Sequence, residues 1–156
     1  NPLMRRGFDE TMARLERGGI QGVIIPDLPA EASEIYGQCR GRGMDLIRLV
    51  APTTTRQRQK EVVSQCSGFV YAVSVKGVTG ARQSLPIEIR RQVEALKTLT
   101  DLPVCVGFGI SNARQVDDML AFADGVIVGS HLMAGVMESS DPVRSALLAF
   151  NELMES

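Results

Sequence analysis

Aromatic side chains are scarce in this sequence of 156 residues, which has no tryptophan, two tyrosines and five phenylalanines. Charge is balanced as well, with 17 lysines and arginines against 18 aspartates and glutamates. Proteins that bind nucleic acids present a basic patch, and those that bind single strands also stack bases on aromatic side chains. No basic cluster interleaved with aromatic residues occurs here, so we exclude a nucleic-acid-binding protein.

Long apolar runs and cysteine pairs are also missing. The longest apolar run is far below the roughly 18 residues that span a bilayer, and the sequence does not open like a signal peptide. Cys39, Cys66 and Cys105 are odd in number and lack the spacing of metal ligands, which predicts buried free thiols. We therefore expect a single globular domain over residues 1–156, located in the cytoplasm, without a membrane segment or a bound metal.

Short apolar segments alternate with longer amphipathic segments along the whole sequence. The apolar segments predict strands at 22–28, 45–52, 68–75, 102–109 and 124–130. Helical periodicity predicts helices at 8–17, 30–42, 55–66, 86–99, 112–122 and 141–154. The strands are apolar at nearly every position, which is typical of a parallel sheet buried on both faces. This alternation predicts right-handed βαβ units, in either a doubly wound sheet or part of a (β/α)8 barrel.

Unusual residues gather at the ends of the predicted strands. In both architectures, ligands bind at the carboxyl ends of parallel strands. These ends carry Asp27, the threonines of "APTTT" at 53–55, a long loop at 74–86, the segment "GFGIS" at 107–111, and Gly129-Ser130. The opposite connections are ordinary glycine turns, so one end of the sheet is the predicted functional end. For Asp27 we favour capping of the next helix, or bonding to loop amides, over a catalytic role.

Two successive strand ends have the composition of an anion site. Glycine allows backbone N–H groups to approach a ligand closely, and a following helix start adds free N–H donors and the positive end of the helix dipole. The pattern "SHLMAGVM" after Gly129 suits the extra short helix that many barrels place at a phosphate. In the alternative interpretation, Gly107, Gly109 and Gly129 are turn glycines, and Ser111 and Ser130 are helix N-caps.

Three further features remain open at this level. The loop 74–86 is longer than a strand–helix connection needs and holds Thr79 and Gly80, so it is either a lid over the ligand or a surface loop. Tyr71 either lines the pocket or belongs to the core. His131 is the only histidine; it supports no Ser-His-Asp set and is predicted at the surface, at a helix start.

The sequence resembles the tryptophan synthase alpha chain family in five segments of the same order and spacing: "IIPDLPAEAS", "APTTT", "GFVYAVSVKGVTGAR", "VCVGFGIS" and "ADGVIVGS". This resemblance runs from Asn1-Pro2 to the C-terminus and implies a partial (β/α)8 TIM barrel of five parallel strands with flanking helices. It also implies cleavage of indole-3-glycerol phosphate to indole and glyceraldehyde 3-phosphate. Indole would then pass to a beta subunit that carries pyridoxal phosphate, with no cofactor in this chain.

The same resemblance implies roles for individual residues. The phosphate-binding positions of the family are matched by Gly80, Gly109, Gly129 and Ser130. Residues around the indole and in the closing loop are matched by Tyr71, Thr79 and Phe108. The walls of the indole pocket would be Ile24, Val50 and Ile127.

The sequence departs from the family pattern in two places. A (β/α)8 barrel needs about 250 residues, and the first three strands have no counterpart here. The family's catalytic glutamate and aspartate lie on and just after the second strand, so the resemblance implies no catalytic residue in this chain, and we expect no useful lyase activity from it alone. His131 stands where the family usually has a small residue beside the phosphate turn.

An incomplete barrel leaves two sheet edges open, at the strands predicted for 22–28 and 124–130. We expect these edges to be covered by self-association or by another segment. Two alternative functions stay open on the sequence: a phosphate-binding half barrel without catalysis, and another phosphate-sugar barrel enzyme. The second would require lysines or acids at the strand ends, where only Asp27 is found.

Overall fold

Five parallel strands lie side by side in the order β1-β2-β3-β4-β5. The computed structural model describes residues 7–29, 31, 33–73, 85–107, 109–138 and 141–154. The strands are β1 (Gly22–Ile24), β2 (Asp45–Val50), β3 (Val70–Val73), β4 (Val104–Gly107) and β5 (Gly125–Ile127). The helices are α2 (Phe8–Arg17), α3 (Ser33–Gly41), α4 (Arg56–Ser64), α5 (Leu85–Lys97), α6 (Ala113–Leu120), α7 (Ser130–Glu138) and α8 (Pro142–Met154). None of the described helices is both long enough and apolar enough to cross a membrane.

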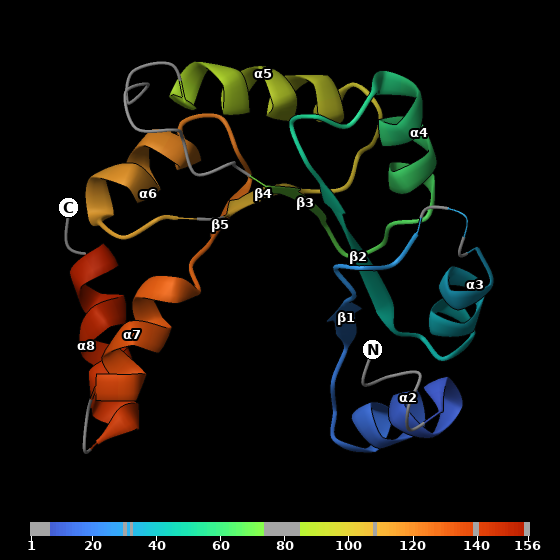
Figure 1. The fold of residues 1–156 in the computed structure, drawn as a ribbon, viewed down its shortest axis with the longest axis horizontal. Coiled ribbons are helices and arrows are strands. Elements are labelled where there is room, and N and C mark those ends of the chain that lie inside the picture. The colour runs from blue at the N-terminus through green and yellow to red at the C-terminus, as the bar shows by residue number, and fades with distance from the viewer. Residues whose placement is uncertain are drawn as a thin grey trace.

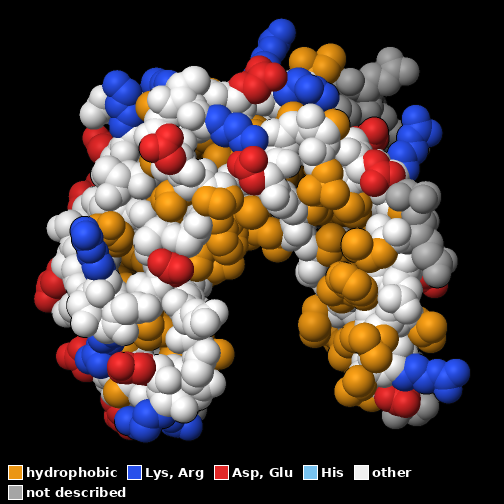
Figure 2. Space-filling model, turned by 180° about the vertical axis from the view of Figure 1, so that it is seen from behind, with side chains coloured by type: hydrophobic (Ala, Val, Ile, Leu, Met, Phe, Trp, Pro, Cys, Tyr) orange, Lys and Arg blue, Asp and Glu red, His pale blue; other side chains and the backbone are white. Residues whose placement is uncertain are grey.

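The sheet is curved into an open half-barrel. Helices α3, α4, α5 and α6 follow the outer side of the curve, while α2 lies at one end of the arch and the α7–α8 pair at the other (Figure 1). The space between these two ends is open, as Figure 2 shows from behind. The structure therefore confirms the predicted fold, five parallel strands with flanking helices that form part of a (β/α)8 barrel.

Strand register separates a hollow face from a helix-covered face. Side chains on a strand alternate between faces, and residues paired across parallel strands share one. One row of paired residues points to the inside of the arch and defines what we call the hollow face: Leu49, Tyr71, Cys105 and Gly125. Their neighbours Val50, Ala72 and Val106 are fully buried among helix residues such as Val62 of α4 and Val93 of α5. The main core thus lies between the sheet and its outer helices.

A second, smaller core lies under α2 and α3 and contains Met12, Ile25, Cys39, Met44 and Leu46. Cys39 and Cys66 are buried and Cys105 is half-buried, all as free thiols. Burial raises the pKa of each of these thiols. The prediction of buried free thiols is confirmed for the first two, and Cys105 instead lies on the hollow face.

The strands are shorter than predicted because turns begin at their carboxyl ends. β1 ends at Ile24 rather than at 28, since Pro26 has no N–H to donate and Leu28 N donates to Ile25 O at 3.2 Å. β2 ends at Val50 because Thr54 N donates to Ala51 O at 3.0 Å. The predicted strand ends are therefore loops, which is where ligands can reach backbone amides.

An acidic residue fixes the start of β4. Asp124 accepts a hydrogen bond from Lys97 Nζ at 2.7 Å and another from Val104 N at 2.8 Å. Both bonds lower the pKa of the Asp124 carboxyl, and the bond from Lys97 has the larger effect. Since the folded pKa is lowered, the stabilisation is present above the ordinary carboxyl pKa and is lost as the pH falls through the folded value.

We expect Asp124→Asn to lower the free energy of unfolding by about 0.5–1 kcal/mol at pH 7, because the amide keeps an oxygen for Val104 N but loses the ion pair in an exposed setting. The difference between the two proteins should shrink as the pH falls below the ordinary carboxyl pKa, because the wild-type carboxylate becomes protonated as the pH passes through its lowered folded value. Urea unfolding at pH 7 and at a series of lower pH values measures this. A constant difference across pH would show that packing, and not charge, is responsible.

Candidate functional site

The strands β3, β4 and β5 end at the same level. Gly107 is paired with Val73 on one side and Ile127 on the other. Gly109 lies two residues after Gly107, and Gly129 lies two residues after its partner Ile127. The loops after β4 and β5 therefore begin side by side. Gly109 has a φ of 76°, in the left-handed region that favours glycine. The structure thus brings together the two glycine loops that the sequence predicts as an anion site.

Tyr71 lies across Gly107 toward β5. A Cβ added to Gly107 would sit 2.5 Å from the Tyr71 hydroxyl oxygen and 2.9 Å from Ile127 Cβ. Glycine is therefore required at 107 for the tyrosine ring to reach the carboxyl ends of β4 and β5 on the hollow face. Tyr71 is half-buried, and this burial raises the pKa of its hydroxyl, which therefore remains protonated and able to donate a hydrogen bond at neutral pH.

Two of the three predicted pocket walls share the face of Tyr71. Ile24 pairs with Ile47, which lies on the same side of β2 as Leu49, the partner of Tyr71. Ile127 contributes the other wall, beside Gly107.

Val50 differs from what the resemblance implies, because it pairs with Ala72 and is fully buried among helix residues. Strand alternation therefore places its side chain on the helix-covered face. Thr79, Gly80 and Phe108, and most of the proposed lid, lie outside the described residues.

Helix α7 begins with exposed N–H donors at the second glycine loop. Gly129 O accepts from Met133 N at 3.0 Å, which makes Gly129 the residue before the first turn, and Ser130 is the first helical residue. Gly129 has no side chain that could cap the first-turn amides of α7. Gly129 and Ser130 are both exposed, while His131 and Leu132, which follow in the first turn, are half-buried, so the start of α7 is open to solvent at Ser130.

Helix α6 is capped from within. Asn112 Oδ1 accepts from Gln115 N at 3.0 Å, and Gln115 Oε1 accepts from Ser111 N at 2.8 Å. The N-cap is therefore Asn112 and not Ser111, which corrects the alternative interpretation drawn from the sequence. Because these two donors of α6 are already used, α7 has the more open of the two helix starts.

Two other predicted candidates lie near this end of the sheet. Asp27 is exposed in the turn after β1, as expected for the solvated end of a strand. His131 is only partly exposed, and its Nε2 lies 3.9 Å from Glu152 Oε2 of α8. The imidazole thus faces α8 from the first turn of α7, and is less exposed than a surface histidine at a helix start was predicted to be.

A pair of arginines that hold the loop after β1 was not predicted from the sequence. Arg48 is only 3% exposed and donates to Leu28 O at 3.1 Å and Pro29 O at 3.0 Å, and also to Gln65 Oε1. Arg58 donates to both carboxylate oxygens of Glu31 at 2.6 and 3.2 Å. The signal available in the sequence was a single arginine inside the apolar strand "DLIRLV".

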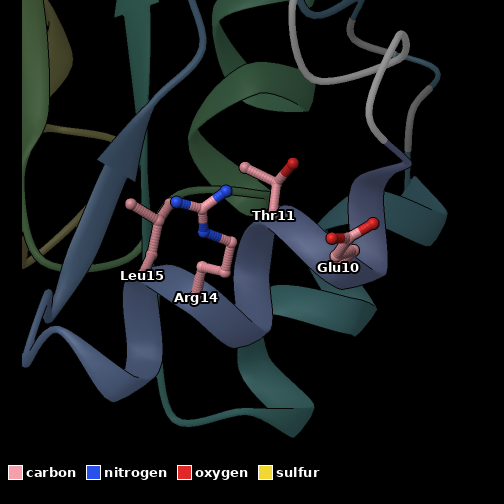
Figure 3. Close-up of a pocket in the computed structure, with 4 residues that line it drawn as sticks. All are labelled: Glu10, Thr11, Arg14 and Leu15. Carbon is pink, nitrogen blue, oxygen red and sulfur yellow. The ribbon is translucent and has the colours of Figure 1, made fainter.

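Two concave regions fall outside the predicted site. One lies beside this loop and is lined by Leu28, Arg48, Thr54 and Arg58, among others. The other, shown in Figure 3, is lined by Glu10, Thr11, Arg14 and Leu15, all on α2. Leu49 of the hollow face and Thr54 also line the first region, but none of the described residues matched to the family's site lines either one. The register of β3, β4 and β5 is what places the candidate site on the hollow face at the ends of these strands.

Comparison with known proteins identifies the family of this chain. A family model for the tryptophan synthase alpha chain matches residues 1–156. The tryptophan synthase alpha chain of Carboxydothermus hydrogenoformans is 51% identical over 134 residues, which cover 85% of this chain and 50% of that protein. The crystal structure of the tryptophan synthase A-subunit of Pyrococcus furiosus matches with a TM-score of 0.87 and 30% identity, covering 100% of this chain and 64% of that chain.

The structure of the tryptophan synthase a2b2 complex of Pyrococcus furiosus gives the same TM-score of 0.87 at 32% identity, covering 100% of this chain and 64% of that chain. This chain spans about half the length of the curated relative it matches. The half-barrel corresponds to part of a complete TIM barrel in these structures. The chain belongs to the tryptophan synthase alpha chain family.

Proposed function

We propose that the hollow face at the ends of β3, β4 and β5 binds indole-3-glycerol phosphate, and that the chain serves tryptophan biosynthesis. The observation that carries this proposal is the pairing of Gly107 with Ile127, which sets the two glycine loops at one level beside the Tyr71 ring. An apolar wall with a few polar groups at one end suits an aromatic ligand that carries a phosphate.

The phosphate would bind at the first turn of α7. The Ser130 hydroxyl and the backbone amides after Gly129 would donate hydrogen bonds there, and the positive end of the helix dipole favours the negative charge. Gly109, on the neighbouring loop, would let its backbone approach the same oxygens. The indole ring would then lie against Tyr71 and Ile127.

These residues support binding rather than proton transfer. Cleavage requires one proton delivered to the indole ring and another removed from a glycerol hydroxyl, and each such step contributes about 10²–10⁴-fold in rate. No position of this sequence matches the acid and the base that the family resemblance implies. We therefore expect the chain alone to bind without releasing indole, and indole formation above background would contradict this assignment.

A beta subunit is the proposed protein partner, since a relative of known structure is described as an a2b2 complex. Pyridoxal phosphate chemistry would belong to that subunit.

Calorimetric titration with indole-propanol phosphate, an analogue that cannot be cleaved, tests the binding site. We expect Ser130→Asp to weaken binding by about 100-fold or more, because the new carboxylate repels phosphate at the helix start. Ser33→Asp is the matched control, since Ser33 is likewise the exposed first residue of a helix, α3. Its affinity should equal that of the wild type.

The other outcomes are equally informative. Equal binding by wild type and Ser130→Asp would place the ligand elsewhere. Equal affinities for inorganic phosphate and for the analogue would favour the phosphate-binding half barrel without an indole pocket. Absence of binding by the wild-type chain would contradict a preformed site on this half of the barrel.

A further inference from the structure

The concave region beside the loop after β1 contains a buried cation that the proposed site does not use. The region has a volume of about 200 Å³ and lies between this loop, β2 and α4. Arg48 of β2 and Arg58 of α4 both line it. Its apolar walls include Ile25, Leu28, Leu49 and Val62. A space of this size and composition suits a small ligand with one charged group.

The charge of Arg48 has no direct counter-ion among the described residues. Its side chain is 3% exposed, and its guanidinium donates only to neutral oxygens: Gln65 Oε1 at 3.2 Å, Leu28 O at 3.1 Å and Pro29 O at 3.0 Å. A guanidinium has five N–H donors and these bonds use three, so the others have no acceptor in this part of the chain. A charge buried at such a cost is typical of binding sites, where the ligand brings the opposite charge.

Arg58 supplies a second cation, whose counter-ion is displaceable. Its side chain is 40% exposed and donates to Glu31 Oε1 at 2.6 Å and Oε2 at 3.2 Å. The hydrogen bond from Arg58 lowers the pKa of Glu31, and the charge of Arg48 also contributes, so both cations act on one carboxylate. Because Glu31 is itself 70% exposed, its carboxylate can turn into water at little cost and leave the guanidinium to another anion.

We propose that this region binds the carboxylate of a small organic acid, held by Arg48 and Arg58, with the hydrocarbon part of the acid against the apolar walls. Arginine recognises carboxylates through paired N–H donors, which a lysine could not present. Arg48 lies on the same side of β2 as Val50, the helix-covered face, and therefore opposite the face of Tyr71. The inference does not depend on the proposed function.

NMR titration of the isotope-labelled chain with isobutyrate and with acetate tests the proposal. We expect a dissociation constant of about 1–10 mM for isobutyrate, and about 10-fold weaker binding of acetate, which lacks the branched hydrocarbon part. Arg48→Met keeps much of the side-chain volume and should weaken isobutyrate binding by about 10-fold or more. Arg58→Gln, at a more exposed position, should weaken it by about 3- to 10-fold. Circular dichroism checks that both variants fold.

Glu31→Gln separates binding from a purely structural role of the two arginines. Removing the competing carboxylate should tighten isobutyrate binding by about 3- to 10-fold, although it breaks the ion pair with Arg58. Arg56→Gln is the matched control, because Arg56 begins the same helix but donates to Ala95 O and Thr98 Oγ1. This variant should bind isobutyrate like the wild type, and so should Ser130→Asp, whose change lies at the other proposed site.

Four results would overturn the proposal. The first is the lack of saturable isobutyrate binding by the wild-type chain up to about 100 mM. The second is binding that Arg48→Met and Arg58→Gln leave unchanged, which would place the acid elsewhere. Equal affinities for acetate and isobutyrate would exclude the apolar walls, and weaker binding by Glu31→Gln would show that this carboxylate supports the site instead of competing for it.

Discussion

Gly107→Ala is expected to lower the free energy of unfolding by about 1–3 kcal/mol and to displace the Tyr71 ring from the hollow face. The new Cβ would lie 2.5 Å from the hydroxyl oxygen of Tyr71, 2.8 Å from its Cε2 atom and 2.9 Å from Ile127 Cβ. Ile127 Cβ is attached directly to a strand backbone and cannot yield. The ring must therefore move, and with it one wall of the proposed indole pocket.

Gly129→Ala is the matched control for this prediction. The substitution is the same and the residue ends the neighbouring strand loop, but an added Cβ at Gly129 meets no atom within 4 Å. Its free energy of unfolding should stay within about 0.5 kcal/mol of the wild type. Chemical denaturation measures both variants. Equal effects of the two would mean that alanine acts through the backbone and not through the contact with Tyr71.

A double-variant cycle identifies the contact itself. Combining Gly107→Ala with Tyr71→Ala removes the ring that the methyl group displaces, so the two effects should not add, and the coupling should be about 1 kcal/mol. The close approach to Ile127 remains in both backgrounds and cancels in the cycle. Additive effects would show that strain against Ile127, and not the tyrosine, dominates the cost at Gly107.

The order of strands and helices was predictable from the sequence because apolar segments alternate with amphipathic ones, and that pattern alone sets a parallel sheet covered by helices. The ends of the strands were not. Pro26 interrupts hydrogen bonding within the apolar segment 22–28, and hydropathy does not register a missing N–H.

The part of the candidate site that was predictable from the sequence is its glycines, because a glycine at a strand end indicates a turn or a close approach of the backbone to a ligand. Gly109 and Gly129 were recognised as strand-end glycines, and the register of β4 with β5 brings them to one level. Val50 was assigned to the pocket by resemblance, yet strand alternation puts it among helix residues. Which side of a strand faces a ligand depends on the pairing of strands, which an apolar run does not encode when both faces are buried.

Arg48→Ala is expected to have the largest effect on stability, lowering the free energy of unfolding by about 2–4 kcal/mol. Arg48 is 3% exposed and its guanidinium holds Leu28 O, Pro29 O and Gln65 Oε1. Alanine leaves a cavity behind the sheet and removes all three hydrogen bonds at once. The exposed Glu31–Arg58 pair would still link the loop after β1 to α4.

Arg48→Met separates packing from charge in that effect. Methionine fills much of the same volume. The buried guanidinium has no carboxylate at hydrogen-bonding distance among the described residues, so its charge is costly to desolvate, and removing that charge offsets part of the loss of the three hydrogen bonds. We therefore expect Arg48→Met to cost about 1 kcal/mol or less. The Glu31 carboxyl, whose pKa is lowered by the hydrogen bond from Arg58, supplies an independent measure, because loosening of the loop should return its pKa toward the ordinary value.

Urea unfolding and NMR titration of Glu31 together decide between the two roles of Arg48. If Arg48→Met matches the wild type in stability while the Glu31 pKa rises, the guanidinium positions the loop and does not stabilise the core. If both variants lose 2–4 kcal/mol, the hydrogen bonds to Leu28 O and Pro29 O are indispensable to the fold. In either case the edge strand β1 depends on a residue of β2, since only Arg48 reaches from the interior of the sheet to the carbonyls of that loop among the hydrogen bonds of the described residues.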